Sequence, residues 1–276
     1  MELPDGRRVQ LWTGGASAGP AVLVCHGTPD TRWVARTGES AAFRLGVRLV
    51  SVNRPGYGSS TPTRSTSASV ADDCLAVLDV LGVDRVGVVG MSVGSLYAAA
   101  LAARHPDRVT SLAVVAAPTE TRTATGPIEA LVEKYRPEFA AGAASMDVAD
   151  PDDEAVARRW LAALPPADAG LLASLGHEAV AASAREALAR HDGYLRDAAW
   201  LFSDWAIDWP AIRCPAQLCY GTQDDRNPPE AGRWWADRIP HAELTVTETT
   251  HLATLLLNWP RILEHLRAGA RKPRSG

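Results

Sequence analysis

The sequence has little of the residue types that mark several other protein classes. Only 4 of its 276 residues are cysteine, and they show neither CxxC spacing nor a histidine pattern typical of a zinc site. We therefore expect no metal and no cofactor site. We interpret the cysteines as small buried hydrophobic residues in the reducing environment of the cytoplasm. They are Cys25, Cys74, Cys214 and Cys219.

Long hydrophobic runs and an excess of positive charge are also missing. No run approaches the roughly 20 apolar residues that span a bilayer, and the first residues lack the apolar core of a signal peptide. The formal net charge is −4, without a basic stripe. This charge argues against nucleic acid or an anionic membrane surface as a partner. We expect a small-molecule substrate and a cytoplasmic chain that acts as a monomer or a homodimer.

Apolar runs recur along the chain in the pattern of strands that are buried on both faces. The expected strands are Ala21–Cys25, Val47–Val52, Val86–Val89, Leu112–Ala116, Ala216–Tyr220 and Ala242–Val246, after a hairpin of Met1–Leu3 and Arg8–Trp12. Apolar residues at helical spacing fall between them, at Val70–Leu81 and Leu96–Arg104. This alternation predicts an α/β fold with a mostly parallel twisted sheet flanked by helices.

The alternation stops between Thr119 and Trp209, a stretch that has the pattern of several helices without strands. A helical insertion in such a core is commonly a cap over the active site, because ligands bind at the carboxyl ends of the strands. We therefore predict a core of residues 1–118 and 210–276, with residues 119–209 as a helical cap, or lid. The alternative is a helical excursion that packs elsewhere on the core.

Residues 90–94 read Gly-Met-Ser-Val-Gly and match the pattern G-x-S-x-G between an expected strand and an expected helix. In that context the tight turn forces the serine into a strained backbone conformation that exposes its hydroxyl group. Gly90 and Gly94 provide the small residues that the close approach of strand and helix requires. We predict Ser92 as a nucleophile. The alternative is a structural turn in which Ser92 only caps the helix.

A second motif, Cys25-His26-Gly27-Thr28-Pro29, follows the first buried strand. Glycine permits an unusual backbone angle that aims the next amide toward the serine turn, whereas proline has no N–H to offer. We therefore predict that the amides of Thr28 and Val93 form an oxyanion hole. We interpret the His26 ring as a structural imidazole that holds this loop.

The late part of the chain carries candidates for an acid and a base. His251 follows the last expected strand, where its ring could reach Ser92, and the other histidines lie in less suitable places. Asp224 and Asp225 follow the preceding strand, and a carboxylate there can orient a histidine. Glu120 is the outside candidate for that acid. The chain order of serine, aspartate and histidine differs from the orders in the chymotrypsin and subtilisin types.

The substrate pocket is expected between residues 28–33 and the helical insertion, with His26, Pro29, Trp33 and Met91 in its wall. Because the insertion offers mainly aliphatic and aromatic carbon, we expect a predominantly apolar pocket. An aminopeptidase would instead need an acidic group from the insertion to hold the free amine of its substrate. The glutamates that could serve are Glu129, Glu133, Glu138 and Glu178.

With these motifs in this order, the chain resembles the α/β-hydrolase superfamily, in the branch that has a helical cap between the sixth and seventh strands. The matching segments are His26-Gly27-Thr28-Pro29, Arg54-Pro55-Gly56-Tyr57-Gly58-Ser59-Ser60, Gly221-x-x-Asp224 with Pro228, and His251-Leu252. The G-x-x-D spacing favours Asp224 over Asp225. Two positions depart from the family pattern, Asn53 in place of the common aspartate and Thr250 in place of the common glycine.

The resemblance implies acyl chemistry without a cofactor: His251 deprotonates Ser92, which attacks a carbonyl, and water releases the acyl-enzyme. We expect a carboxylic ester of a small or medium-sized, mostly neutral hydrophobic substrate. The same triad could serve acyl transfer, lactone opening, C–C cleavage or the N-terminal peptide cleavage of proline iminopeptidases. A receptor-like member with slow turnover is a further alternative. The epoxide hydrolases and haloalkane dehalogenases of the superfamily need an aspartate as nucleophile, and Ser92 excludes them.

Overall fold

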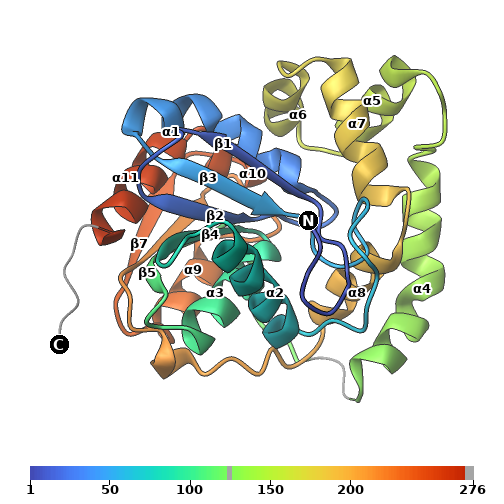
Figure 1. Ribbon diagram of the computed structural model, residues 1–276. Coiled ribbons are helices and arrows are strands. Elements are labelled where there is room, and N and C mark those ends of the chain that lie inside the picture. Colours follow the sequence, from blue (N-terminus) through green and yellow to red (C-terminus); the bar gives the residue numbers. More distant parts are fainter. Residues whose placement is uncertain (123–125, 271–276) are drawn as a thin grey trace.

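The computed structural model describes residues 1–122 and 126–270, and a seven-stranded sheet forms its centre (Figure 1). The strands are β1 (Leu11–Gly15), β2 (Ala21–Cys25), β3 (Arg48–Val52), β4 (Val86–Met91), β5 (Val109–Val115), β6 (Ala216–Gly221) and β7 (Ala242–Thr247). Their order in the sheet is β1-β3-β2-β4-β5-β6-β7, and β1 is antiparallel to β3 while the other pairs are parallel. The predicted α/β fold is confirmed.

Both faces of the sheet are covered by helices, which explains why its inner strands β2, β4, β5 and β6 are buried along their whole length. In β2, Leu23 belongs to one core cluster and its neighbours Val22 and Val24 belong to the other, as the two-residue period of a strand requires. Helices α2 (Ser67–Val80), α3 (Gly94–Arg104) and α9 (Pro229–Ala236) pack on the first face. The second face carries α1 (Glu39–Leu45), α10 (His251–Leu256) and α11 (Trp259–Ala270).

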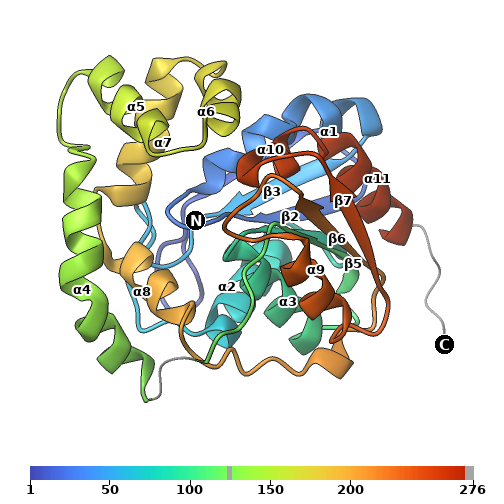
Figure 2. The same cartoon turned by 180° about the vertical axis from the view of Figure 1, so that it is seen from behind.

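Five helices lie between β5 and β6, and the described part of residues 119–209 contains no strand. Both views show them on one side of the molecule, next to one end of the sheet (Figures 1 and 2). They are α4 (Ile128–Ser145), α5 (Asp153–Ala162), α6 (Pro166–Ala173), α7 (His177–Leu188) and α8 (Asp192–Trp200). We call residues 119–209 the helical insertion. Residues 123–125 of the predicted cap and residues 271–276 of the predicted core lie outside the described residues.

Two short 3₁₀ helices connect the main elements, η1 (Arg32–Gly38) after β2 and η2 (Trp209–Ala211) before β6. The N-terminal hairpin that the sequence predicts is present in a short form: Glu2 and Arg8 form an antiparallel bridge, and the Gly6 N–H donates to the Leu3 carbonyl at 2.9 Å in the turn between them. Residues 11–12 of its predicted second segment belong instead to β1, which pairs along five residues with β3. The insertion follows the fifth strand of the sheet in chain order.

Candidate active site

Ser92 lies in the turn between β4 and α3 with a φ of 52°, a left-handed conformation that is costly for a residue with a side chain. The neighbouring strand and the helix hold it there: its N–H donates to the Val115 carbonyl at 2.8 Å, and its carbonyl accepts from Ser95 at 2.9 Å. Such strain concentrates at functional sites because the surrounding structure must maintain it.

The two glycines of this turn are required by close backbone contacts. A Cβ atom on Gly90 would lie 2.4 Å from the Cα atom of Ser95. A Cβ atom on Gly94 would lie 2.1 Å from the carbonyl oxygen of Cys25, on the neighbouring strand β2. A side chain at either position would therefore collide with backbone, which is the reason why the pattern G-x-S-x-G accompanies this turn.

His251 begins α10, and its Nδ1 atom lies 2.7 Å from Oδ2 of Asp224, in the loop after β6. The other carboxylate oxygen of Asp224 accepts from the backbone N–H groups of Arg226 and Asn227, at 3.0 and 3.1 Å. Burial opposes the charge of Asp224, but the hydrogen bond and charge of His251 and the two backbone donors outweigh it, so the pKa of Asp224 is lowered. The carboxylate is thus ionised and oriented toward the imidazole.

The other two carboxylates that the sequence leaves open contact different groups. Asp225 is exposed to solvent. Glu120 accepts a hydrogen bond from the Trp205 backbone at 2.6 Å and pairs with Arg122 at 3.0 Å. Of the three candidates, Asp224 is the one that the structure brings to His251, in agreement with the G-x-x-D spacing.

A cavity of about 620 Å³ brings the predicted residues together. Ser92 and His251 both line it, and so do Thr28 and Val93, whose amides are the expected oxyanion donors. Among the residues that the structure describes, neither of these two amides donates a hydrogen bond to a protein acceptor. They are therefore available to a ligand at this position. The wall also contains three of the predicted pocket residues, which are Pro29, Trp33 and Met91.

His26 does not line this cavity, and its placement in the substrate pocket is corrected. The ring is completely buried and stands edge-on to Tyr57, with 4.8 Å between ring centroids. Burial and the nearby Arg54 charge lower its pKa well below the usual value, so the ring is neutral. Its Nδ1 atom lies 2.9 Å from the Gly27 carbonyl, and Nε2 lies 3.4 Å from the Arg54 backbone N–H. The ring lies against Tyr57 and the Arg54 backbone, and these contacts keep it out of the cavity wall.

Arg54 holds the same loop through its guanidinium group, a contact that the sequence does not reveal. It donates to the carbonyls of His26 at 2.5 Å and Gly27 at 2.8 Å. The Gly27 carbonyl and the Thr28 N–H belong to one planar peptide unit, so fixing the carbonyl also fixes the direction of the N–H. Arg54 thereby orients one of the two expected oxyanion donors.

The charge of Arg54 is balanced by Asp197, which comes from α8 of the insertion and lies at 2.5 Å. Burial opposes the charge of the guanidinium, but the carboxylate outweighs this effect and the pKa of Arg54 is raised. Asp197 also accepts from the hydroxyl groups of Tyr57 at 2.7 Å, Tyr97 at 2.6 Å and Thr28. A buried side chain of the insertion therefore holds the core loop that carries Thr28.

Asn53, where the family commonly has aspartate, faces a second carboxylate of the insertion. Its Nδ2 group donates to Glu186 on α7 at 2.7 Å, while its Oδ1 atom accepts from the Arg32 backbone at 2.7 Å. An aspartate at this position would place two negative groups against each other, whereas asparagine makes a hydrogen bond. The departure from the family pattern is thus matched by the insertion, and the turn remains held.

The insertion contributes an apolar wall to the cavity. The residues from it include Met146, Trp160, Leu164, Leu172, Leu175 and Val180. None of the four insertion glutamates proposed to bind an amine is among the lining residues. The loop after β2 adds one carboxyl group, Asp30, whose pKa burial raises to about 6 while the Thr31 N–H donates to it at 2.7 Å. The cavity wall is thus mainly apolar, and its charged members besides Asp30 are Arg36, Glu39 and Arg226.

The four cysteines are unpaired and buried, as expected of small hydrophobic residues. Within residues 1–122 and 126–270, no group of three or more histidine, cysteine or acidic side chains is arranged to hold a metal ion. No helix in these residues has the length and apolar character needed to cross a bilayer.

Comparison with known proteins identifies relatives along most of the chain. Pimeloyl-[acyl-carrier protein] methyl ester esterase from Chromobacterium violaceum is 36% identical over 241 residues, which are 86% of this chain and 88% of the relative. An epoxide hydrolase from Caballeronia sordidicola is 33% identical over 132 residues, which are 46% of this chain and 40% of that protein. The solved structure of an alpha/beta hydrolase fold protein from Nakamurella multipartita has 28% identity and a TM-score of 0.67, covering 97% of this chain and 98% of that one.

The family model of the alpha/beta hydrolase fold matches residues 20–256, a range that includes the serine turn, the acid loop and the histidine. The esterase adds an enzyme of similar sequence over nearly its full length. The chain is therefore a hydrolase that belongs to the α/β-hydrolase fold family.

Proposed function

We propose that this chain is a serine hydrolase that cleaves a carboxylic ester through an acyl-enzyme on Ser92, with His251 as general base and Asp224 as the acid that orients it. The observation that carries the proposal is the contact of 2.7 Å between His251 and Asp224, together with the position of Ser92 and His251 on one cavity. The relative named as a methyl ester esterase supports ester chemistry.

The chemistry follows from the arrangement of these groups. His251 takes the hydroxyl proton of Ser92 as the oxygen attacks the carbonyl carbon, and Asp224 stabilises the imidazolium that forms. The amides of Thr28 and Val93 hold the negative oxygen of the tetrahedral intermediate. The imidazolium then gives its proton to the leaving alcohol, and a water molecule that His251 deprotonates releases the acid and restores Ser92.

The helical insertion acts in this proposal as a cap that lines the acyl pocket and excludes water. Its apolar residues favour small or medium-sized neutral hydrophobic substrates over charged ones. Because Glu129, Glu133, Glu138 and Glu178 do not line the cavity, the peptidase alternative lacks the amine-binding group expected for it. Epoxide hydrolases, to which about half of the chain is similar, use a carboxylate nucleophile, and Ser92 stands at that position.

The test compares short-chain p-nitrophenyl esters with amino-acid p-nitroanilides on one preparation of the enzyme. We expect rapid ester cleavage, slow anilide cleavage and labelling of Ser92 by a fluorophosphonate. Ser92→Ala should lower kcat for the ester by about 10⁶-fold, as in other triads, without unfolding the protein. Labelling of Ser95 in place of Ser92, or faster cleavage of the anilides, would contradict the proposal.

A further inference from the structure

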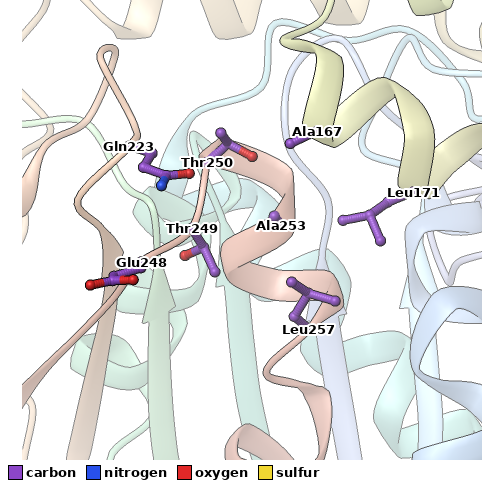
Figure 3. Close-up of a pocket in the computed structure, with 8 residues that line it drawn as sticks. All are labelled: Ala167, Leu171, Gln223, Glu248, Thr249, Thr250, Ala253 and Leu257. Atoms are coloured by element: carbon purple, nitrogen blue, oxygen red, sulfur yellow. The ribbon is translucent and has the colours of Figure 1, made fainter.

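Helix α6 of the insertion packs against α10, the helix that begins with His251. Figure 3 shows Ala167 and Leu171 of α6 facing Thr250, Ala253 and Leu257 across a small groove. Asp168 lies between these two residues in α6 and is only 1% exposed although it carries a carboxyl group. A carboxyl group so deeply buried needs partners for its oxygen atoms.

Asp168 finds these partners at the beginning of α10. Its Oδ1 atom accepts from the Thr250 hydroxyl at 2.5 Å and from the Ala253 N–H at 2.9 Å. Its Oδ2 atom accepts from the Leu252 N–H at 3.1 Å. Two of the donors are backbone N–H groups just after His251 and the third is the side-chain hydroxyl of the residue just before it, so one side chain of the insertion contacts both neighbours of the proposed base.

These bonds replace the usual cap of a helix. The first N–H groups of a helix have no partner within it, and the side chain of the N-cap residue commonly accepts from one of them. Thr250 is the N-cap of α10, but its side chain accepts no such bond, and its hydroxyl donates to Asp168. The cap is instead supplied by a residue 82 positions away in the sequence.

Thr250 is an independent indication of this arrangement, since it is one of the two positions that depart from the family pattern. A glycine there would have no hydroxyl group to donate. The unusual residue on the core side and the buried carboxylate on the insertion side therefore meet in one hydrogen bond. Thr250 and Asp168 do not contact a substrate in the main cavity, because neither is among the residues that line it.

We propose that Asp168 is a positioning residue for the general base: the insertion, through this carboxylate, fixes the first turn of α10 and so places His251 between Asp224 and Ser92. The proposal rests on the function proposed above. Proton transfer requires hydrogen-bond distance, and a displacement of 1 Å can cost about 100-fold in rate. The insertion thus both lines the pocket and sets the geometry of the base.

The test measures kcat per active site, counted by fluorophosphonate labelling, together with KM. Asp168→Ala should lower kcat for a p-nitrophenyl ester by about 10- to 100-fold and change KM by less than about threefold. The matched control is Asp152→Ala, which removes a carboxylate cap from another helix of the insertion, where Asp152 accepts from the Glu154 N–H at 2.9 Å. This control should lower thermal stability and leave kcat within about twofold.

Two further variants keep the test decisive if Asp168→Ala does not fold. Thr250→Val replaces only the hydroxyl group and should lower kcat by a smaller factor. The double variant with Asp168→Asn should lower kcat by less than the product of the two separate factors, because both substitutions remove the same hydrogen bond. Asp168→Asn keeps one acceptor oxygen and should retain more activity than the alanine variant. A kcat per labelled site that is unchanged in the Asp168 variants, or lowered equally by Asp152→Ala, would overturn the positioning role. Full turnover in Ser92→Ala would instead overturn the proposed function itself.

Discussion

The two sides of Ser92 are built in different ways. On one side, His251 and Asp224 come from loops of the core that follow β7 and β6, and their contact leaves the His251 side chain 12% exposed. On the other side, the loop with Thr28 is held by Arg54, whose partner Asp197 comes from the insertion. On the base side the proposed acid and base therefore both come from the core, with the insertion contributing the Asp168 contacts at the start of α10, whereas on the oxyanion side the Thr28 loop is held through a buried ion pair between core and insertion.

Because of this difference, we expect substitutions on one side to lower mainly the reaction rate and substitutions on the other side to lower mainly the stability of the fold. In the proposed mechanism Asp224 stabilises a histidine that becomes charged during the reaction, so we expect its loss mainly in the rate. Arg54 and Asp197 form a pair whose side chains are 4% and 3% exposed, and neither group touches the reacting atoms. Removing one partner of such a pair leaves a buried charge without compensation, and the expected loss is mainly in stability.

The largest effect is expected for Asp224→Asn on the base side. The amide cannot stabilise the imidazolium and favours the wrong tautomer, so kcat should fall by about 10⁴-fold while the protein remains folded. Asp225→Asn is the matched control and should retain nearly full activity, because Asp225 is exposed. Steady-state kinetics and circular dichroism on both variants provide the measurement. Equal losses in the two variants would place the acid at another position.

The next effect is expected for Asp197→Asn on the oxyanion side. The amide leaves Arg54 buried without its counter-charge, and the free energy of unfolding should fall by about 3–5 kcal/mol. The rate should fall by less than the roughly 10²–10³-fold that the loss of a complete oxyanion donor costs, because the Thr28 N–H remains present. Urea unfolding and kcat measured on the same sample compare the two losses. A rate loss as large as that of Asp224→Asn, without destabilisation, would remove the contrast between the sides.

The smallest effect is expected for Asp30→Asn, which tests the charge on the oxyanion loop. Burial raises the pKa of Asp30 to about 6, so the folded state disfavours its ionised form. Stability from this group is present below the ordinary carboxyl pKa and is lost as the pH rises toward about 6. The variant should therefore match the native protein near pH 4 and exceed it above pH 6, by less than about 3 kcal/mol. Thermal unfolding between pH 4 and 8 measures the difference in stability between the two proteins. A difference that does not change with pH would contradict a raised pKa of Asp30.

Much of the fold and of the candidate site could be predicted because the signals are local. Six of the expected strands and both expected helices are present with small shifts at their ends, since apolar runs and helical spacing report burial directly. The N-terminal hairpin is present but shorter than predicted, because a turn signal alone does not decide that residues 11–12 pair with β3. The pocket position of His26 was wrong for a similar reason, since nothing in its motif reveals which way the ring turns.

The sequence by itself determined the serine turn, the loop of Thr28 proposed to form the oxyanion hole, and the chain order of the proposed acid and base, because each depends on neighbouring residues in a strand–turn–helix or strand–loop unit. Tertiary structure alone decided which carboxylates support these units. Asp197 lies 143 residues from Arg54, and Asp168 lies 82 residues from Thr250. In the sequence both are ordinary acidic residues of a helical stretch. Their roles follow from the donors that folding brings around them, because the cost of burying a carboxylate is offset only where such donors surround it.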